Sequence, residues 1–329
     1  MKKAEMKEQV AKLHEIADSV RTQLGEESVI TFDNNIWEPI EAISSGSVVL
    51  DRALGVGGFP RGRIVELFGS EGSGKTSISL ATIVQAQRAG EICAFIDAEN
   101  SFNPEWAALL GVDMKFLLLS QESCCETVFA LIDQFIEKGV TVIVVDSIAS
   151  LSPRAELEGE TGDLHVGLMA RLMAQALRRL SGKLNRSRVL AIFINQLRLQ
   201  IGIMFGNPET TPGGKALKFH SSIRLDVRSA TKIKKADEVV GMEIKASVVK
   251  NKVAPPFKSA VVDFLFDRGF DNEAAYVDDA VEKGVFKKKG SYLEYQGMNK
   301  YRADWCELLR TDTALFKQIV KEVDSAPQV

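Results

Sequence analysis

The chain has 329 residues, of which 45% are hydrophobic and 26% charged, and these proportions exclude a disordered polypeptide. The formal net charge of −3 excludes a protein coated in positive charge, although basic stretches at residues 171–188 and 215–252 leave local contact with nucleic acid open. No apolar run reaches the roughly 20 residues that span a bilayer, and the first ten residues lack the apolar core of a secretory signal. We therefore expect a cytoplasmic protein with no membrane partner.

The N-terminal region carries a helical pattern. Residues 5–24 place apolar side chains three or four positions apart, which predicts an amphipathic helix. Gly25 follows, and residues 28–32 (SVITF) are a candidate strand. A lone helix and strand cannot bury their own apolar face, so docking on the chain's own core and docking on a neighbouring subunit both stay open.

From about residue 40 the pattern changes to apolar runs that alternate with helical stretches. Four runs are nearly continuous, at residues 63–69, 92–98, 140–147 and 189–196. Strands buried on both faces have this pattern, and helical crossovers between them predict a doubly wound α/β fold with a mostly parallel sheet. After about Gly269 the chain becomes more polar, with a helix predicted near residues 312–323. We therefore expect an N-terminal arm (1–36), a core (37–269) and a small α+β C-terminal domain (270–329).

The cysteines do not follow a metal-ligand or disulfide pattern. None of the four, Cys93, Cys124, Cys125 and Cys306, belongs to a CxxC pair or lies at a Cys/His ligand spacing. We expect reduced thiols that are mostly buried.

Residues 69–76 read GSEGSGKT and fit the pattern GxxxxGK[ST] between a buried strand and a helical stretch. This context aims backbone N–H groups and a helix N-terminus at phosphates, while Gly72 and Gly74 permit backbone conformations that other residues avoid. Lys75 supplies a charge near the β and γ phosphates, and Thr76 offers a hydroxyl to Mg²⁺. We predict an ATP site formed by Gly69, Ser70, Glu71, Gly72, Ser73, Gly74, Lys75 and Thr76.

Two carboxylates follow buried strands at the edge of the sheet where ligands of such folds collect. Asp146 ends the run VTVIVVD and suits the shell of a magnesium ion, although Asp146 or Ser147 could instead cap a helix. Glu99 can polarise an attacking water as a general base. Spacing alone does not choose between Glu99 and Asp97 for this role.

The chain resembles the bacterial RecA recombinases over about residues 40–270, through GSEGSGKT (69–76), FIDAEN (95–100), VIVVDS (142–147), FINQLR (193–198), GNPETTPGGKALKF (206–219) and VVKNKVAPPFK (248–258). The resemblance implies a RecA-type ATPase core that uses ATP and Mg²⁺, with Glu99 as the general base and Asp146 on the magnesium ion through water. It makes Gln196 the sensor of the γ-phosphate. Lys250 and Lys252, which a strand would project to one face, match a pair that reaches ATP bound to the adjacent subunit and stabilises transition-state charge.

The same resemblance implies two DNA-binding loops, at residues 158–165 and 197–214. The apolar side chains of the second loop are expected to separate stacked bases, and an ordinary buried loop is the alternative. Arg171 and Arg178 lie seven apart on one helical face and match positions that meet the DNA backbone, although a solvated face has the same pattern. The implied DNA-binding residues are Val166, Arg171, Arg178, Arg198, Leu199, Gln200, Ile201, Met204, Phe205, Gly213, Gly214 and Lys215, with Arg228 and Lys245 in a secondary site for duplex DNA.

Several positions depart from the family pattern. Trp106 and Phe266 stand where the family has two tyrosines that sandwich adenine, and both keep a stacking face. Asn103 stands where the family has an aspartate near the adenine amino group, and its amide oxygen can still accept that hydrogen bond. Ser229 and Ser247 replace basic residues of the secondary DNA site, which weakens the expectation of duplex capture. The sequence ends without the acidic tail common in the family, so we expect less restrained duplex binding.

Together these features predict an ATP- and DNA-dependent recombinase that forms helical filaments on single-stranded DNA and pairs it with homologous double-stranded DNA. The resemblance also implies stimulated self-cleavage of a LexA-type repressor, and partners that load or regulate the filament. One alternative is an ATP-gated DNA filament that acts as a signalling scaffold without efficient strand exchange. A second is a ring-forming motor on the same core, and the two DNA loops and the lysine pair argue against it.

Overall fold

The structure, a computed structural model, describes residues 3–25, 28–29, 31, 39–159, 167–199, 209–235 and 237–326. By its internal contacts the chain divides into two units, Met1–Ile40 and Glu41–Val329. The larger unit contains the whole central sheet and the C-terminal region.

The first unit is dominated by helix α1 (Lys3–Leu24), which confirms the helix predicted there. The helix ends at Leu24 and is followed by Gly25, whose φ of 98° lies in the left-handed region that favours glycine. Arg21 contacts the segment after the helix, because its Nε donates to the carbonyl of Val29 at 3.1 Å. Most of the large apolar side chains along α1 are exposed, whereas Ala17 is buried. The strand predicted over residues 28–32 lies partly outside the described residues.

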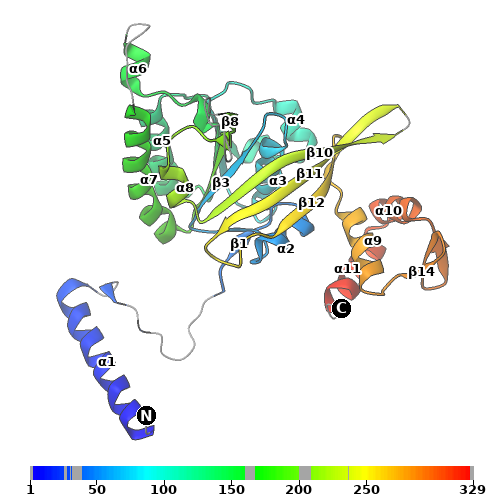
Figure 1. The fold of residues 1–329 in the computed structure, drawn as a ribbon, viewed down its shortest axis with the longest axis horizontal. Helices are drawn as coiled ribbons and strands as arrows, with labels where there is room; N and C mark the ends of the chain where they lie inside the picture. Colours follow the sequence, from blue (N-terminus) through cyan, green and yellow to red (C-terminus); the bar gives the residue numbers. More distant parts are fainter. Residues whose placement is uncertain are drawn as a thin grey trace. The chain divides into compact units, whose positions relative to one another are not determined.

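A nine-stranded sheet forms the centre of the second unit (Figure 1), in the order β13-β12-β11-β10-β3-β7-β6-β4-β5. Neighbouring strands from β10 to β5 in this order are parallel, and β10 to β13 are antiparallel. The four apolar runs of the sequence form the buried strands β3 (Ile64–Gly69), β4 (Cys93–Asp97), β6 (Val142–Asp146) and β7 (Leu190–Gln196). The prediction of an α/β fold with a mostly parallel central sheet is confirmed. The remaining strands of this sheet are β5 (Leu117–Ser120), β10 (Ile223–Lys235), β11 (Glu238–Asn251), β12 (Ser259–Leu265) and β13 (Gly269–Phe270).

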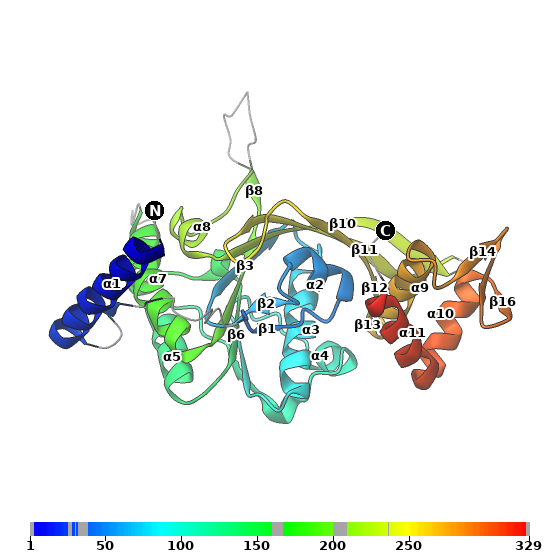
Figure 2. The same cartoon turned by 90° about the horizontal axis from the view of Figure 1, so that it is seen from below.

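Helices cover both faces of the parallel part of this sheet (Figure 2). One apolar cluster joins the sheet to α2 (Val48–Leu54), α3 (Lys75–Arg88) and α4 (Pro104–Leu109). A second cluster on the other face includes α5 (Cys125–Glu137), α7 (Leu168–Ser187) and α8 (Ala216–His220). Among the described residues, no helix combines the length and the apolar character that a membrane crossing needs. Shorter elements are β1 (Ala42–Ile43), β2 (Phe59–Pro60), α6 (Arg154–Glu158), β8 (Arg198–Leu199), β9 (Glu209–Thr210) and single 3-10 turns at Met114–Phe116 and Ile148–Ser150.

The antiparallel hairpin of β10 and β11 is the longest element of the sheet, and its far end projects beyond the other strands (Figure 1). Side chains on the first half of β10 alternate between buried and half-buried, whereas those beyond Arg228 are largely exposed. Arg228 and Lys245 face each other across the hairpin. The exposed half therefore presents a polar ribbon rather than a core strand.

The C-terminal region has an apolar cluster of its own around Trp305, Phe286 and Tyr295. Trp305 is fully buried, and its indole Nε1 donates to the carbonyl of Leu293 at 2.9 Å. This region also contacts the core, because the N–H of Val48 donates to the side chain of Asn272 at 3.0 Å. The domain division at residue 270 stays a prediction. The elements here are α9 (Asn272–Glu282), β14 (Lys287–Lys289), β15 (Tyr292–Tyr295), β16 (Met298–Lys300), α10 (Arg302–Thr311) and α11 (Thr313–Ser325).

All four cysteines are buried and free, which confirms their prediction as buried thiols. Burial raises the pKa of Cys93 and of Cys125 to about 12. Both therefore stay protonated and unreactive at neutral pH.

Candidate active site

The phosphate loop connects the buried end of β3 to the first turn of α3. Gly69 is required here, because a Cβ would come within 2.0 Å of the carbonyl oxygen of Val227. Gly72 and Gly74 adopt φ values of 67° and 96°, so both need glycine's freedom in the left-handed region. The first N–H groups of α3 consequently point out of the loop, in the arrangement that binds anions.

Lys75 is nearly buried and lies against its own loop. Its Nζ donates to the carbonyls of Ser70 at 2.6 Å and Gly69 at 3.3 Å. Burial lowers the pKa of Lys75, while the carboxylates of Asp146 and Glu99 act in the opposite direction. A cation held this close to a helix N-terminus can neutralise phosphate charge.

Asp146 and Thr76 meet at the end of β6, where their residue types fit a magnesium ion. The hydroxyl of Thr76 donates to Oδ2 of Asp146 at 2.6 Å. Burial raises the pKa of Asp146 to about 6, with Glu99 and Asp97 adding to the rise and Thr76 and Lys75 opposing it. A carboxylate and a hydroxyl are hard oxygen donors of the kind that Mg²⁺ prefers. Asp146 does not cap the turn that follows, so the capping alternative is not supported by its contacts.

The structure separates Asp97 from Glu99, which sequence spacing could not do. Asp97 is almost fully buried and accepts hydrogen bonds from the backbone N–H groups of Ser101 at 3.2 Å and Phe102 at 2.9 Å. Its carboxylate therefore holds the loop after β4. Glu99 is half-buried, and its Oε1 accepts a hydrogen bond at 2.6 Å from Nε2 of Gln196 at the end of β7. Glu99 is thus the carboxylate that faces the predicted sensor.

Ser147 is a further contact of Glu99, and the sequence does not predict it. Its hydroxyl donates a short hydrogen bond to Oε1 of Glu99, the same oxygen that Gln196 contacts. The sequence alone indicates for Ser147 only a possible role as a helix cap. Its position directly after Asp146, at the end of a strand next to β4, is the signal that could have identified it.

The two aromatic residues predicted to sandwich adenine pack against each other. The ring centroids of Trp106 and Phe266 lie 6.3 Å apart with their planes at 67°. Two rings stacked on opposite faces of a base lie parallel and about 7 Å apart, twice the ~3.5 Å contact distance between carbon atoms. One ring must therefore rotate before a base can enter between them. Asn103 caps α4, because its Oδ1 accepts from the N–H of Trp106 at 3.0 Å, and a second lone pair of that oxygen is left for a ligand.

Lys250 and Lys252 share one face, as their spacing predicts, but lie at the opposite end of the sheet from the phosphate loop. Both Nζ atoms donate to the carbonyl of Phe219, at 3.0 and 3.3 Å. The backbone N–H of Lys252 bonds to Ser222, which bonds in turn to Ile64, the first residue of β3. The phosphate loop follows the last residue of β3, which lies about 17 Å away at the rise of a β-strand. These lysines therefore do not border the phosphate loop of their own subunit.

Some of the predicted DNA-binding residues are exposed, some contact other parts of the protein, and some lie outside the described residues. Arg171, Arg178, Arg198, Lys215 and Lys245 are exposed. Gly213 and Gly214 have φ values of 81° and 76°, and a Cβ at Gly214 would lie 2.9 Å from Ala170, so the loop end packs closely on α7. Lying outside the described residues are Val166, Gln200, Ile201, Met204 and Phe205, together with the side chain of Leu199 and most of the first loop.

Arg228 is already paired with carboxylates. Its guanidinium donates to both oxygens of Glu209, at 2.8 and 2.6 Å, and to Asp226 at 2.7 and 3.1 Å. These contacts raise the pKa of Arg228 further above its ordinary value. Two carboxylates offset its single charge, so Arg228 anchors β9 at the base of the second loop and is less available to a DNA phosphate than sequence reasoning predicted.

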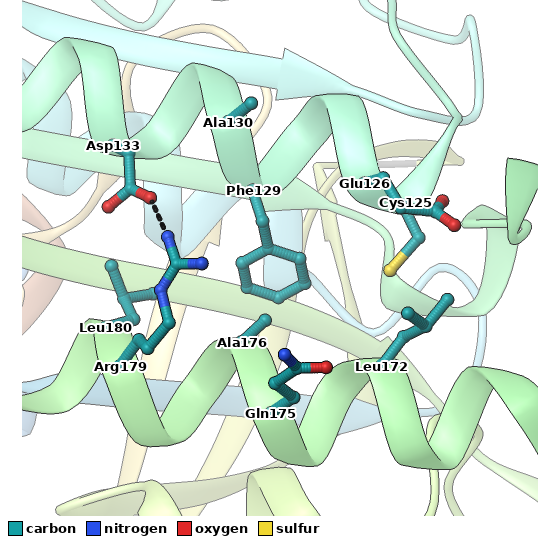
Figure 3. Close-up of a pocket in the computed structure, with 10 residues that line it drawn as sticks. All are labelled: Cys125, Glu126, Phe129, Ala130, Asp133, Leu172, Gln175, Ala176, Arg179 and Leu180. Atoms are coloured by element: carbon teal, nitrogen blue, oxygen red, sulfur yellow. Dashed lines mark hydrogen bonds and ion pairs between the residues drawn. The ribbon is translucent and has the colours of Figure 1, made fainter.

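A groove between α5 and α7 is distinct from this site (Figure 3). Its volume is about 250 Å³, and its apolar lining includes Phe129, Leu172 and Ala176. Arg179 and Asp133 close one end through an ion pair of 2.8 Å. None of the predicted site residues lines this groove.

A buried strand, a glycine-rich loop, a helix and two strand-end carboxylates together define a P-loop nucleotide hydrolase. Comparison with known families shows that residues 11–271 match the RecA N-terminal domain. The chain is 49% identical to Protein RecA of Acinetobacter baylyi, with 84% of this chain and 80% of the relative covered. It is 48% identical to Protein RecA of a Nocardioides species (93% and 88% covered) and 52% identical to that of Mycobacteroides abscessus (83% and 79% covered).

The chain therefore belongs to the RecA family of recombinases. It is a DNA-dependent ATPase, and the family binds single- and double-stranded DNA and assembles into filaments.

Proposed function

We propose that this recombinase uses ATP and Mg²⁺ to form a helical filament on single-stranded DNA, with each ATP site shared between two subunits. The phosphate loop and Lys75 hold the phosphates. Thr76 and Asp146 hold Mg²⁺, Asp146 through a water, and the ion neutralises charge on the transferred phosphoryl group when it is bound. Asn103, Trp106 and Phe266 hold the adenine once one aromatic ring has rotated.

The hydrogen bond between Glu99 and Gln196 is the observation that carries this proposal. The amide N–H₂ group of Gln196 donates to Oε1 of Glu99, and a γ-phosphate oxygen would be a second, charged acceptor that can draw this group toward itself. When Gln196 turns to the phosphate, Oε1 of Glu99 is freed of one hydrogen bond and can accept one from the attacking water. The chain directly after Gln196 leads into the second DNA loop, so the same movement changes how that loop is presented.

The position of Lys250 and Lys252 supports a site shared in trans. Lys252 lies near the start of β3, and Lys250 lies two strands away from its middle, whereas the phosphate loop lies at its end. A head-to-tail contact would bring the lysines of one subunit to the phosphates of the next, and such contacts build open filaments when they do not close. Hydrolysis then requires assembly on DNA, because an isolated subunit lacks the two cations that stabilise transition-state charge.

The exposed arginines of α7 and the second loop are proposed to hold the DNA strand by its phosphates, with homology tested by base pairing. Homologous duplex DNA is the second substrate. Self-cleavage of a LexA-type repressor on the filament, loading and regulatory partners, and a cytoplasmic location are further parts of the proposal that rest on family membership.

The rate of ATP hydrolysis with and without single-stranded DNA tests this function. We expect hydrolysis to depend on Mg²⁺ and to rise at least about tenfold on adding DNA, as an enzyme completed by assembly requires. Equal rates with and without DNA would refute the shared site. Formation of joint molecules with homologous duplex, measured in the same preparation, separates a recombinase from a signalling scaffold.

A further inference from the structure

Glu66 is a fully buried carboxylate in the middle of β3, and it is not among the residues proposed to touch nucleotide or DNA. Nε of Arg224 donates to its Oε2 in a short ion pair, and Nδ2 of Asn195 donates to its Oε1 at 3.2 Å. A buried carboxylate is unfavourable unless its oxygens are bonded, and both oxygens of Glu66 are. A core strand with an apolar residue at this position would avoid that cost, so the charge calls for an explanation.

The Asn195 side of this network reaches both the sensor and the second DNA loop. Nδ2 of Asn195 also donates to the carbonyl of Pro212 at 3.2 Å, where the chain returns from that loop. Its Oδ1 accepts from the backbone N–H of Gln196 at 3.0 Å. One fully buried amide therefore joins Glu66, the end of the loop and the residue that contacts Glu99.

Arg224, the other partner of Glu66, lies next to Lys250 of the lysine pair and next to the residue that precedes the phosphate loop. Arg224 stands beside Lys250 in the register of β10 and β11, and beside Glu66 in the register of β10 and β3. Its guanidinium lies 4.4 Å from the ring centroid of Phe68, which directly precedes the phosphate loop. Burial lowers the pKa of Lys250, the positive charges of Lys252 and Arg224 add to the fall, and the negative charge of Glu66 opposes it. The charge of Glu66 therefore acts on a lysine proposed to serve the neighbouring subunit.

We propose that Glu66 is a positioning residue that couples occupancy of the second DNA loop to ATP hydrolysis. A displacement of Pro212 by bound DNA moves Asn195, and Asn195 sets both the backbone of Gln196 and one bond of Glu66. Glu66 then passes the change through Arg224 toward Lys250. Buried polar networks of this kind have few satisfied arrangements, so they switch between discrete states rather than deform gradually. This inference rests on the proposed function of Gln196, Lys250 and the loop.

The test uses the full chain with Glu66→Gln, which removes the charge at constant volume, and Asn195→Ala, which cuts the link to Pro212 and keeps the Glu66–Arg224 pair. Asp271→Asn is the matched control, because Asp271 is also buried in an ion pair, with Arg310, but lies at the C-terminal region. We expect both network variants to lower the DNA-stimulated kcat at least about tenfold, equivalent to about 1.4 kcal/mol. For both network variants, the KM for ATP and the DNA concentration at half-saturation should stay within about threefold of the wild-type values. For the control variant, kcat, KM and the half-saturating DNA concentration should all stay within about twofold of the wild-type values.

The double variant of Glu66 and Asn195 adds a readout that a purely structural role would not move. If both act in one network, the double variant is no slower than the more severe single variant. A DNA-stimulated kcat of Glu66→Gln within about twofold of the wild type would overturn the proposal. So would multiplied effects in the double variant, or a loss of kcat that the control shares. If Glu66→Gln does not fold, Asn195→Ala decides by the same kcat criterion. An absence of DNA stimulation in the wild type would instead refute the proposed function.

Discussion

Replacing Asp146 with asparagine should stabilise the nucleotide-free protein while removing its ATPase activity. The carboxyl of Asp146 has a pKa of about 6 in the folded chain, against 3.8 for an unperturbed aspartate, and burial is the main cause. That difference corresponds to about 3 kcal/mol of folding free energy that is lost when the carboxyl ionises. Asparagine is uncharged and keeps an oxygen that can accept the 2.6 Å hydrogen bond from Thr76. We therefore expect the free energy of unfolding to rise by up to about 3 kcal/mol near pH 7.5.

The stability difference between the Asp146→Asn variant and the wild type should depend on pH. Because the pKa of Asp146 is raised in the folded state, its contribution to stability is full below about pH 4 and is lost as the pH rises through about 6. The advantage of the variant should shrink to about 1.6 kcal/mol near pH 5 and to about 0.5 kcal/mol near pH 4. Urea unfolding of both proteins across this range, without nucleotide or magnesium, measures the difference. A variant that is equally or less stable near pH 7.5 would refute the reasoning.

Three other substitutions test separate parts of the site. Glu99→Gln should lower DNA-stimulated hydrolysis at least about 100-fold and leave ATP binding intact, because it removes the base but not the phosphate contacts; near-normal turnover would remove Glu99 from that role. Lys250→Ala should lower DNA-stimulated kcat by tenfold or more without changing the melting temperature, since its bonds are to carbonyls that water can satisfy; unchanged kcat would contradict a site completed in trans. Asp97→Ala should lower the free energy of unfolding by about 1–3 kcal/mol, because it leaves the N–H groups of Ser101 and Phe102 without their acceptor; a change below about 0.5 kcal/mol in urea unfolding would refute the structural role.

The fold of the core could be predicted largely because its signals are local. Strands β3, β4, β6 and β7 are continuous apolar runs, and a strand needs only its own residues to show that it is buried on both faces. The phosphate loop is local in the same way, since eight consecutive residues carry its glycines, lysine and threonine. The β10–β11 hairpin was not specified, because its outer half is exposed and its residues alternate without a strong pattern.

The parts of the site that sequence could not settle depend on contacts between distant residues. Asp97 and Glu99 differ only in which donors face them after folding, and those donors come from the chain after β4 and from β7. Arg228 is basic in the sequence, but the carboxylate of Glu209, 19 residues away along the chain, reaches it only after folding. The edge-to-face packing of Trp106 on Phe266 likewise joins a helix and a strand end that are far apart in the sequence.

A mixture of two inactive variants tests most directly whether the ATP site is shared. Glu99→Gln subunits keep Lys250 and Lys252, and Lys250→Ala/Lys252→Ala subunits keep Glu99. In a random one-to-one filament, about a quarter of the head-to-tail interfaces pair an intact Glu99 with an intact lysine pair. The account predicts that the DNA-stimulated ATPase of the mixture rises to about a quarter of the wild-type rate, while each variant alone stays near its own background. A mixture that shows only the mean of the two variants would contradict it.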